Sequence, residues 1–453
     1  MTGALMQLVS YGAQDLYLTG NPMLTYFKTV YRRHSNFTME SIVQAFNGPV
    51  GFGNKVSALI YRCGDLVTNM ILEVYLPAIK PEAFNMGTVD HSNMQQFRWV
   101  CDVGHYIMNK VSIEIGGQII DEHYSDWLEI WAQLTVPAGQ KVGYREMIGH
   151  SPGTKDSSLS GLQTNSGGLR PGCADSDGNI IFIPLQFWFC RNVGLALPLV
   201  ALQYHEVRIN IEFAQASTVI VNHNDMPSFN GDATMINGTL DAYLWVDYIY
   251  IDIDERRRFA EMSHEYLIEQ VQFSGDEQVN ISDIPTTKRI PLHFDHCVKE
   301  LVWIGKTLNV PGMEPSNHNF SEKTGMTSID TFSGRNGIAE CGCPAKKARL
   351  AVTRVTLDID CVERFEVRDA SYFNLVETRK HSNIPDSRGI YVYSFSLFPE
   401  VYQPSGTCNF SRLDTAVLKL TLNANAVLCV IRIFATNYNV LRILSGMGGL
   451  AYV

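Results

Sequence analysis

The most constraining feature of this sequence is an internal repeat of one strand-like segment. Residues 110–115 (KVSIEI) match residues 354–359 (RVTLDI) in side-chain type at every position, at an offset of 244 (354 minus 110). A candidate helix start follows each copy, at Ser125 and at Ser371. Self-similarity of this kind indicates that one structural unit occurs twice. We therefore expect two related domains in tandem.

The repeat resumes further along the chain at an offset of 211. The matched pairs are Ile181 with Val392, Phe187 with Phe398, Leu202 with Leu413, Arg208 with Lys419, Ile209 with Leu420 and Ile211 with Leu422. The first half therefore carries about 33 more residues (244 minus 211) between its helix and the next strand. Residues 137–180, rich in Gly, Ser and Asp, accommodate that excess, and the second half has its own long loop at 310–347. Such loops are either functional or tolerated surface insertions, and both interpretations stay open.

Short segments of β-branched and aromatic residues dominate the rest of the pattern, which predicts strands. These segments are 110–115, 180–189, 207–213, 243–251, 391–398 and 417–422. Helical periodicity is scarce. It predicts one helix from Ser125, as its cap, to Leu134, and a shorter turn at 371–376. The apolar stripe of the first helix is Trp127, Leu128, Ile130, Trp131 and Leu134.

Two all-β units of about 200 residues, each with one short helix and long loops, fit a jelly roll better than an immunoglobulin sandwich of about 100 residues. A break between the units is expected around residues 215–238, where Asn, Asp, Gly and Pro cluster. The predicted fold class is thus all-β with two tandem jelly rolls and few helices.

Composition narrows the class of function. Charged residues make up 18% of the 453 residues, below the roughly 25% usual in soluble domains, whereas Tyr and Phe together number 42 (20 plus 22). Such a surface suggests extensive contact with other proteins. The formal charge of −10 argues against coating nucleic acid, which needs unpaired Lys and Arg. The basic run Arg256 to Arg258 lies among acidic neighbours, and we expect these to neutralise it.

Targeting and membrane segments are not expected. No Lys or Arg precedes Lys28, and no apolar run approaches 18 residues, so neither a signal peptide nor a membrane span is predicted. The ten cysteines are too sparse for a disulfide scaffold. Cys341 and Cys343 lack the spacing of usual zinc motifs, and a loop with two free thiols is expected there.

The common sequence motifs of catalytic sites do not occur in the chain. The sequence contains no G-x4-G-K-[ST], G-x-G-x-x-G, G-x-S-x-G or H-E-x-x-H motif, and His264-Glu265 lacks the second His at position 268. The pairs Asp252-x-Asp254 and Asp358-x-Asp360 resemble metal-binding pairs, but solvent-facing strand positions are the simpler explanation. We therefore predict no catalytic, cofactor-binding or metal-binding residues and no enzyme activity.

Some short patterns have weak functional interpretations. The glycosylation pattern occurs at Asn36, Asn237, Asn280, Asn319 and Asn409, but it is common by chance, so the glycosylated residues stay unknown. Residues 31–34 (YRRH) form a small basic cluster that could touch phosphate or an acidic partner, although a solvated strand start is the simpler explanation.

Longer motifs resemble a known family. They are QLVSYGAQDLYLTGNP (7–22), TYFKTVYRRHSNF (25–37), FGNKVSALIYRCGDL (52–66), DERRRFAEMSHEYLIEQVQ (254–272) and NYNVLRILSGMGGLAYV (437–453). The sequence resembles the major capsid proteins of nucleocytoplasmic large DNA viruses, in the branch of the chlorella viruses and marseilleviruses. The motifs lie in family order over nearly the whole chain.

The resemblance implies a double jelly roll with eight strands per roll and a homotrimeric capsomer of pseudo-hexagonal outline that tiles an icosahedral shell. It divides the chain into an N-terminal arm (1–26), a first roll (27–220), a second roll (221–440) and a C-terminal tail (441–453). Heterologous contacts between capsomers would build the shell. The arm would lie at the inner base, the long loops at the outer end, and the tail against its own base or a neighbour.

The resemblance also implies the partners. These are further copies of the chain, minor capsid and penton proteins and, through minor proteins, an inner membrane layer, without direct contact to nucleic acid. The protein would reside in the virion and assemble in the host cytoplasm. The alternative is a carbohydrate- or receptor-binding jelly-roll spike or a minor capsid paralogue, which exposed aromatic residues on the long loops would favour. Residues 149–179 contain no Phe, Tyr or Trp.

Overall fold

The computed structural model describes residues 3–10, 12–79, 97–100, 102–149, 179–222, 236–237, 239–279, 287–307, 352–386, 389–422 and 429–452. It separates into two compact units, Met1–Phe37 and Thr38–Val453. The first unit holds helices α1 (Gly3–Val9) and α2 (Leu16–Thr19). None of its described side chains is buried, so it lacks a core of its own. This exposed segment, residues 1–37, is called the arm below and extends past residue 26, where the arm was expected to end.

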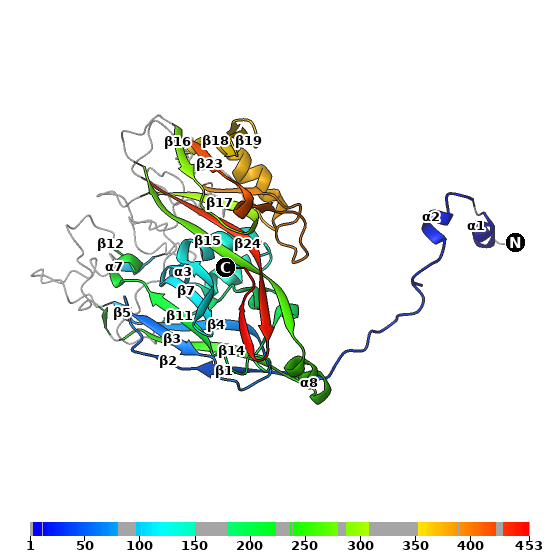
Figure 1. The fold of residues 1–453 in the computed structure, drawn as a ribbon, viewed down its shortest axis with the longest axis horizontal. Helices are drawn as coiled ribbons and strands as arrows, with labels where there is room; N and C mark the ends of the chain where they lie inside the picture. The colour runs from blue at the N-terminus through cyan, green and yellow to red at the C-terminus, as the bar shows by residue number, and fades with distance from the viewer. Residues whose placement is uncertain are drawn as a thin grey trace, which may run out of the picture. The chain divides into compact units, whose positions relative to one another are not determined.

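The second unit opens with a first jelly roll (Figure 1). Among the described residues its eight main strands are β1 (Phe37–Gln44), β3 (Lys55–Leu59), β4 (Leu66–Leu76), β7 (Met108–Ile115), β8 (Gln118–Tyr124), β9 (Asn179–Pro184), β11 (Val207–Phe213) and β14 (Asp241–Ile251). One sheet has the order β1-β14-β4-β9 and the other the order β3-β11-β7-β8. Counted along the chain, these orders are 1-8-3-6 and 2-7-4-5, the double Greek key of a jelly roll.

A second jelly roll repeats this topology. Its main strands in the described part of the chain are β15 (His264–Gln278), β16 (Thr287–Pro291), β17 (Cys297–Thr307), β18 (Val352–Ile359), β19 (Val362–Glu363) with β20 (Arg368–Asp369), β21 (Ile390–Ser394), β23 (Ala416–Leu422) and β24 (Cys429–Leu444). The sheet orders β15-β24-β17-β21 and β16-β23-β18-β19 are again 1-8-3-6 and 2-7-4-5. The predicted fold class of two tandem eight-stranded jelly rolls is confirmed.

Short elements complete the rolls. The minor strands are β2 (Phe46–Asn47), β5 (Ala78–Ile79), β6 (Phe97–Trp99), β10 (Leu197–Pro198), β12 (Ile220–Asn222), β13 (Ile236–Asn237), β22 (Cys408–Asn409) and β25 (Met447–Leu450). The helices are α3 (Val103–Tyr106), α4 (Ser125–Thr135), α5 (Lys141–Met147), α6 (Trp188–Arg191), α7 (Ala216–Val219) and α8 (Ile253–Glu261). Single turns are η3 (Val193–Leu195), the π-helical η6 (Tyr372–Val376), η7 (Glu377–Lys380) and η8 (Phe410–Arg412).

The internal repeat joins equivalent strands, but its registers need correction. β7 and β18 are both the fourth strand of their roll, and β11 and β23 are both the seventh. In the strand register, Arg208 lies opposite Glu114, whereas its match Lys419 lies opposite Thr356 and two positions away from Asp358. The shift of two residues keeps every side chain on its face, because side chains alternate with period two. The match of Ile181 with Val392 is wrong, since Ile181 lies in the core of its roll and Val392 on the outer face of its sheet.

Three other expectations change. The strands expected at 180–189 and 391–398 end at Pro184 and Ser394. Ser125 does not cap α4, since the N-cap residue is Tyr124 with extended backbone and no side-chain capping bond. The helix itself and its buried apolar stripe are confirmed.

The division between the rolls follows from strand pairing. β14 pairs with β4 from Asp241 to Ile249, so a boundary at residues 220 and 221 would separate β14 from the sheet that it completes. We propose the boundary within α8 instead. The tail expected from residue 441 begins inside β24, and β25 folds back onto that strand, with Leu444 opposite Met447.

The two rolls share their longest strands. β15 and β24 run along both rolls in Figure 1. Ile268, Leu441 and Ile443 of these strands are buried in the core of the first roll, and Ile431, Ile433 and Ala435 of β24 lie in the core of the second. Nearly complete burial of these side chains in two cores joins the rolls into one body.

Candidate assembly surfaces

The acidic pairs considered as metal ligands serve local structure. Asp252 is the N-cap of α8, and its Oδ1 accepts from the Ile253 N–H at 2.7 Å. The Asp358 carboxylate forms an ion pair with the Lys419 ammonium of the neighbouring strand. Asp360 Oδ1 accepts from the backbone N–H groups of Asp414 (2.9 Å) and Thr415 (3.0 Å). Within the described ranges, no three His, Cys, Asp or Glu side chains lie where they could hold one metal ion.

The remaining short motifs lie apart from one another. His264 Nε2 contacts the Phe259 carbonyl at 2.8 Å, and Glu265 pairs with Arg442. Arg256 pairs with Asp65 at 3.0 Å, so the bend before β4 of the first roll, and not the neighbouring acids of α8, supplies this partner. The cluster 31–34 is exposed in the arm.

Several expectations fall on residues without a structural description. Cys341, Cys343, Asn280, Asn319 and the loop 310–347 lie outside the described residues, as do residues 150–178 of the first loop. Residues 141–147 of that loop form α5. No helix in the described part is long and apolar enough to cross a bilayer.

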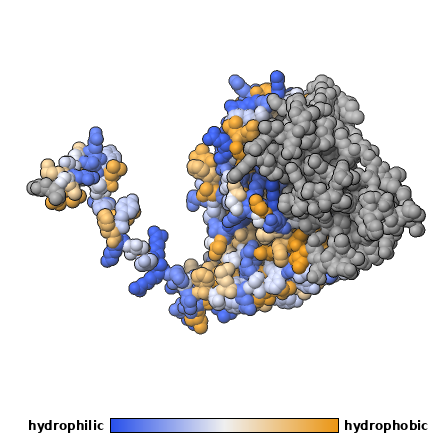
Figure 2. All heavy atoms as spheres, turned by 180° about the vertical axis from the view of Figure 1, so that it is seen from behind, coloured by the Kyte–Doolittle hydropathy of each residue, from blue (hydrophilic) through white to orange (hydrophobic). Residues whose placement is uncertain are grey.

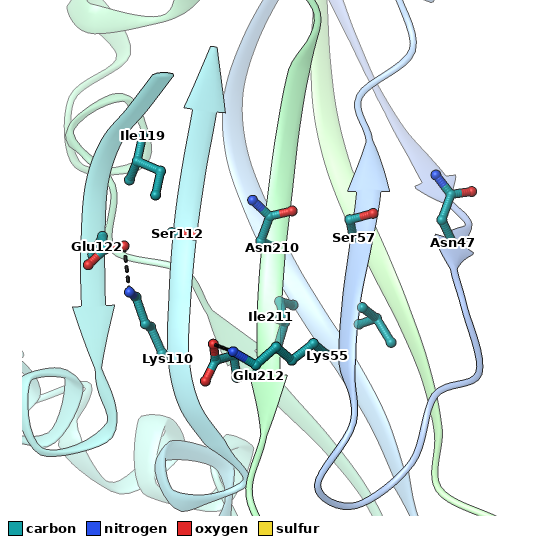
Figure 3. A pocket seen from close by; sticks show the side chains of 11 residues that line it. Asn47, Lys55, Ser57, Lys110, Ser112, Ile119, Glu122, Asn210, Ile211 and Glu212 are labelled. Atoms are coloured by element: carbon teal, nitrogen blue, oxygen red, sulfur yellow. Dashed lines mark ion pairs between the residues drawn. The ribbon is translucent and has the colours of Figure 1, made fainter. Parts of the chain in front are cut away.

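A shallow hollow of about 400 Å³ lies on the outer face of the sheet β2-β3-β11-β7-β8 (Figure 3). Its charged side chains pair across neighbouring strands. Lys110 contacts Glu122 at 2.6 Å, and Lys55 contacts Glu212. Ser112, Asn210 and Ser57 lie opposite one another on β7, β11 and β3, in a row beside these pairs. The face is a polar sheet surface with matched charges, which suits contact with solvent or with another polar surface.

Helix α4 makes an apolar contact between the rolls. This helix follows β8 of the first roll, but its side chains Trp127, Ile130, Trp131 and Leu134 are buried against the second roll. They pack on the outer face of the sheet β15-β24-β17-β21, at Val271, Val302, Ile304, Ile390, Val392 and Phe434. Trp127 lies 5.6 Å from Phe434 and 6.0 Å from Trp131 between ring centroids. The second roll therefore covers the helix of the first.

Ion pairs surround this apolar contact. Asp126 of α4 is fully buried and pairs with Lys306 at 3.3 Å and with Arg432. Arg191 of α6 pairs with Glu269 of β15 at 3.1 Å, and its guanidinium lies 3.8 Å from the Trp131 ring centroid. Buried charges need such partners, because an unpaired charge in a protein interior is strongly destabilising.

A second buried network holds the loop between β21 and β22. The Lys299 ammonium, with no exposed side-chain surface, contacts Glu269 Oε1 at 2.7 Å and donates to the Pro399 carbonyl at 2.8 Å. His381 lies between Glu300 (3.1 Å from Nε2) and Glu400 (3.2 Å from Nδ1). Burial by itself lowers the pKa of His381, but the two carboxylates outweigh it and raise this pKa to about 9.

Stability should therefore fall at alkaline pH. The raised pKa of His381 stabilises the fold fully below its ordinary value of 6.5, and this contribution is lost as pH rises through about 9. The pKa of Glu300 is lowered, against the opposing effect of burial, by His381, so its contribution is lost only in acid. We expect the urea midpoint to fall from pH 7 to 9.5 and the His381→Gln variant to show a flatter profile. The exposed control His293→Gln should keep the native slope; equal slopes for all three proteins would contradict the assignment.

Exposed apolar side chains are concentrated in the arm. Large apolar residues with at least half of their surface exposed include Leu5, Met6, Leu8, Val9, Leu16, Tyr17, Leu18, Met23, Leu24, Tyr26, Phe27, Val30 and Tyr31. Figure 2 shows hydrophobic residues along the arm and interspersed with hydrophilic ones on the body. Exposed apolar clusters of this kind mark interaction surfaces.

These features define a double jelly-roll protein with a buried contact between its rolls and an apolar arm. Two family models match the chain, one for the major capsid protein N-terminus at residues 25–252 and one for the large eukaryotic DNA virus major capsid protein at residues 255–449. The chain belongs to the major capsid proteins of large eukaryotic DNA viruses.

Relatives match over their whole length. The major capsid proteins of Pyramimonas orientalis virus and of Paramecium bursaria Chlorella virus 1 are 43% and 39% identical to this chain, with full coverage of both chains in each case. A chain of the PBCV-1 virus capsid, a quasi-atomic model, matches with a TM-score of 0.73 at 32% identity, over 95% of this chain and 100% of the other. The Faustovirus major capsid protein shares the fold, with a TM-score of 0.66 at 14% identity.

Sequence reasoning missed the buried networks. Their members Lys299-Glu300, His381 and Glu400 lie on three separate segments and match no short motif. A weak signal was available in Lys299-Glu300, two adjacent charges inside an apolar strand pattern, because charged residues are almost never fully buried unless they are paired.

Proposed function

We propose that the chain is a shell subunit that forms homotrimers with six similar rolls around a threefold axis, which then tile an icosahedral capsid. The observation that carries the proposal is the duplicated topology of two rolls joined by shared strands. The sheet orders are 1-8-3-6 and 2-7-4-5 in both rolls. Three such chains present six similar units, and heterologous contacts between them form a ring when the rotation from one copy to the next closes. The match to a chain of a virus capsid supports this role.

The role is structural, and we propose no enzyme activity, cofactor or metal. The protein would reside in the capsid of the virion and assemble in the host cytoplasm. The exposed arm, with its large apolar side chains, suits contact with minor capsid and penton proteins at the inner base, and minor proteins would connect the shell to an inner membrane layer. The net charge of −10 supports the absence of direct contact with nucleic acid.

The native mass tests the proposed oligomer. Light scattering after size exclusion in dilute neutral buffer should give about three times 50.8 kDa, that is about 152 kDa. The same preparation should form larger assemblies, visible by electron microscopy, as the protein concentration rises. A soluble and stable monomer of 50.8 kDa at micromolar concentration would count against the capsomer.

A further inference from the structure

The contact between the two rolls provides a template for the contact between two copies. In the first roll, the connection from the fifth to the sixth strand contains α4. Its Leu128 is buried in the core of its own roll, whereas Ile130 and Trp131 pack on the outer face of the next roll. One short helix thus closes its own roll and attaches the neighbouring one.

The second roll has a corresponding helical connection, but its outward apolar side chains are exposed. The turns η6 and η7 occupy the equivalent connection, between β20 and β21. At an offset of 245 (373 minus 128), Phe373 replaces Leu128 and is buried in the core of the second roll. Leu375 and Val376 then replace Ile130 and Trp131, and they are 44% and 46% exposed. The side chains that should attach a further roll have no cover within the described parts of the chain.

The first roll carries a matching face that is also uncovered. In the second roll, α4 packs on two rows of residues across three strands, Phe434–Val302–Val392 and Arg432–Ile304–Ile390. On the same face of the first roll, two rows cross the corresponding strands β14, β4 and β9, namely Tyr243–Glu73–Phe182 and Asp241–Tyr75–Ile180. Tyr243, Phe182 and Ile180 are 46%, 40% and 46% exposed.

The exposed face is ordered by its own contacts. The rings of Tyr75 and Tyr243 pack edge to face at 6.0 Å. The Tyr75 hydroxyl donates to Glu73 Oε1 at 2.7 Å, and the Trp245 indole N–H donates to Glu73 Oε2. The aromatic side chains are thus held in place before any partner binds, which lowers the entropic cost of association.

The charges on the uncovered surfaces differ from those in the contact between the two rolls of one chain. Within the chain, the acidic Asp126 of the helix meets Arg432 and Lys306 of the sheet. On the uncovered surfaces, Asp241 and Glu73 lie in the two rows of the sheet, and the exposed Arg379 and Lys380 follow the apolar pair of the turn. An acidic face and a basic segment are complementary, with the signs exchanged relative to the contact inside the chain.

We infer that residues 372–380 of one copy pack on the outer face of β9-β4-β14 of a second copy, with Leu375 and Val376 on Phe182, Ile180 and Tyr243. This inference rests on the proposed self-assembly, because the partner is another copy of the chain. The contact joins the second roll of one copy to the first roll of the next. It is heterologous, and three such contacts close a ring of six rolls.

Charge placed in the apolar contact tests the inference. Val376→Glu and Phe182→Glu should each weaken the trimer by about 100-fold, because a buried unpaired carboxylate opposes association. Leu397→Glu is the matched control, since Leu397 is 68% exposed on the same roll and outside the contact. Circular dichroism on each variant checks folding, and light scattering over a dilution series gives the dissociation constant. Unchanged trimers in both contact variants would overturn the inference while leaving the proposed capsomer intact.

A cross-link gives a positive signal that does not depend on destabilisation. Val376→Cys and Phe182→Cys, purified separately and mixed under mild oxidation after dissociation and reassembly, should form a disulfide-linked dimer of one copy of each variant. Val376→Cys mixed with Leu397→Cys should not. Absence of the first cross-link in a wild-type-like trimer would overturn the contact, whereas a wild type that stays monomeric would instead overturn the proposed function.

Discussion

Replacing Trp127 by Ala should destabilise both jelly rolls together. The side chain belongs to a helix of the first roll but is fully buried on the sheet of the second, 5.6 Å from Phe434 between ring centroids. Truncation removes a large apolar contact and leaves a cavity between α4 and the sheet of the second roll. We expect a loss of about 3–5 kcal/mol in the free energy of unfolding.

The transition should stay single, because the shared strands β15 and β24 prevent one roll from unfolding alone. Scanning calorimetry and circular dichroism should show one shifted transition. Leu375→Ala is the matched control, since it occupies the equivalent place in the second roll and is 44% exposed in the chain. Under conditions that keep the protein monomeric, that variant should lose well below half as much. A separate early transition of one roll in the Trp127→Ala variant would contradict the prediction that the two rolls unfold together.

Replacing Lys299 by Met should cost about 3–5 kcal/mol, because it leaves a buried carboxylate short of a partner. The Lys299 side chain has no exposed surface, and its ammonium is shared by Glu269 and the Pro399 carbonyl. Met fills most of the volume but cannot donate. Glu269 would keep Arg191 alone, and the loop around Pro399 would lose its anchor.

The matched control for this variant is Lys55→Met. Lys55 also pairs with a glutamate, Glu212, but its side chain is 76% exposed. Exposed pairs of this type contribute about 0–1 kcal/mol, so the urea midpoint should hardly move. Equal shifts in the two variants would show that burial does not set the strength of the Lys299 contacts.

Much of the fold could be predicted because strands that bury one face must alternate. The matches of β7 with β18 and of β11 with β23 join equivalent strands, since both copies must place the same side of the strand in a core. The errors have the same origin. A shift of two residues leaves the alternation of side chains intact, so the sequence could not reveal that Lys419 lies opposite Thr356 in the strand register. The faulty match of Ile181 with Val392 arose where both faces of the strand are apolar.

The boundary between the rolls could not be predicted from turn-forming residues alone. The segment 215–238 is rich in Asn, Asp and Gly, but β14 follows it and completes the first roll by pairing with β4. In a jelly roll the last strand lies beside the first, so a domain ends only after a long return connection. Local composition marks that connection, not the end of the domain.

The sequence by itself determined the class of fold, the duplication, the family and the apolar stripe of α4, because alternation, periodicity and long motifs are local properties of the chain. Only the tertiary structure decided that this stripe is covered by the second roll and that Lys299 and His381 are buried among carboxylates. It also decided that the equivalent side chains Leu375 and Val376 remain exposed. Which surfaces meet depends on contacts between residues far apart in the chain, and such contacts leave no regular spacing in the sequence.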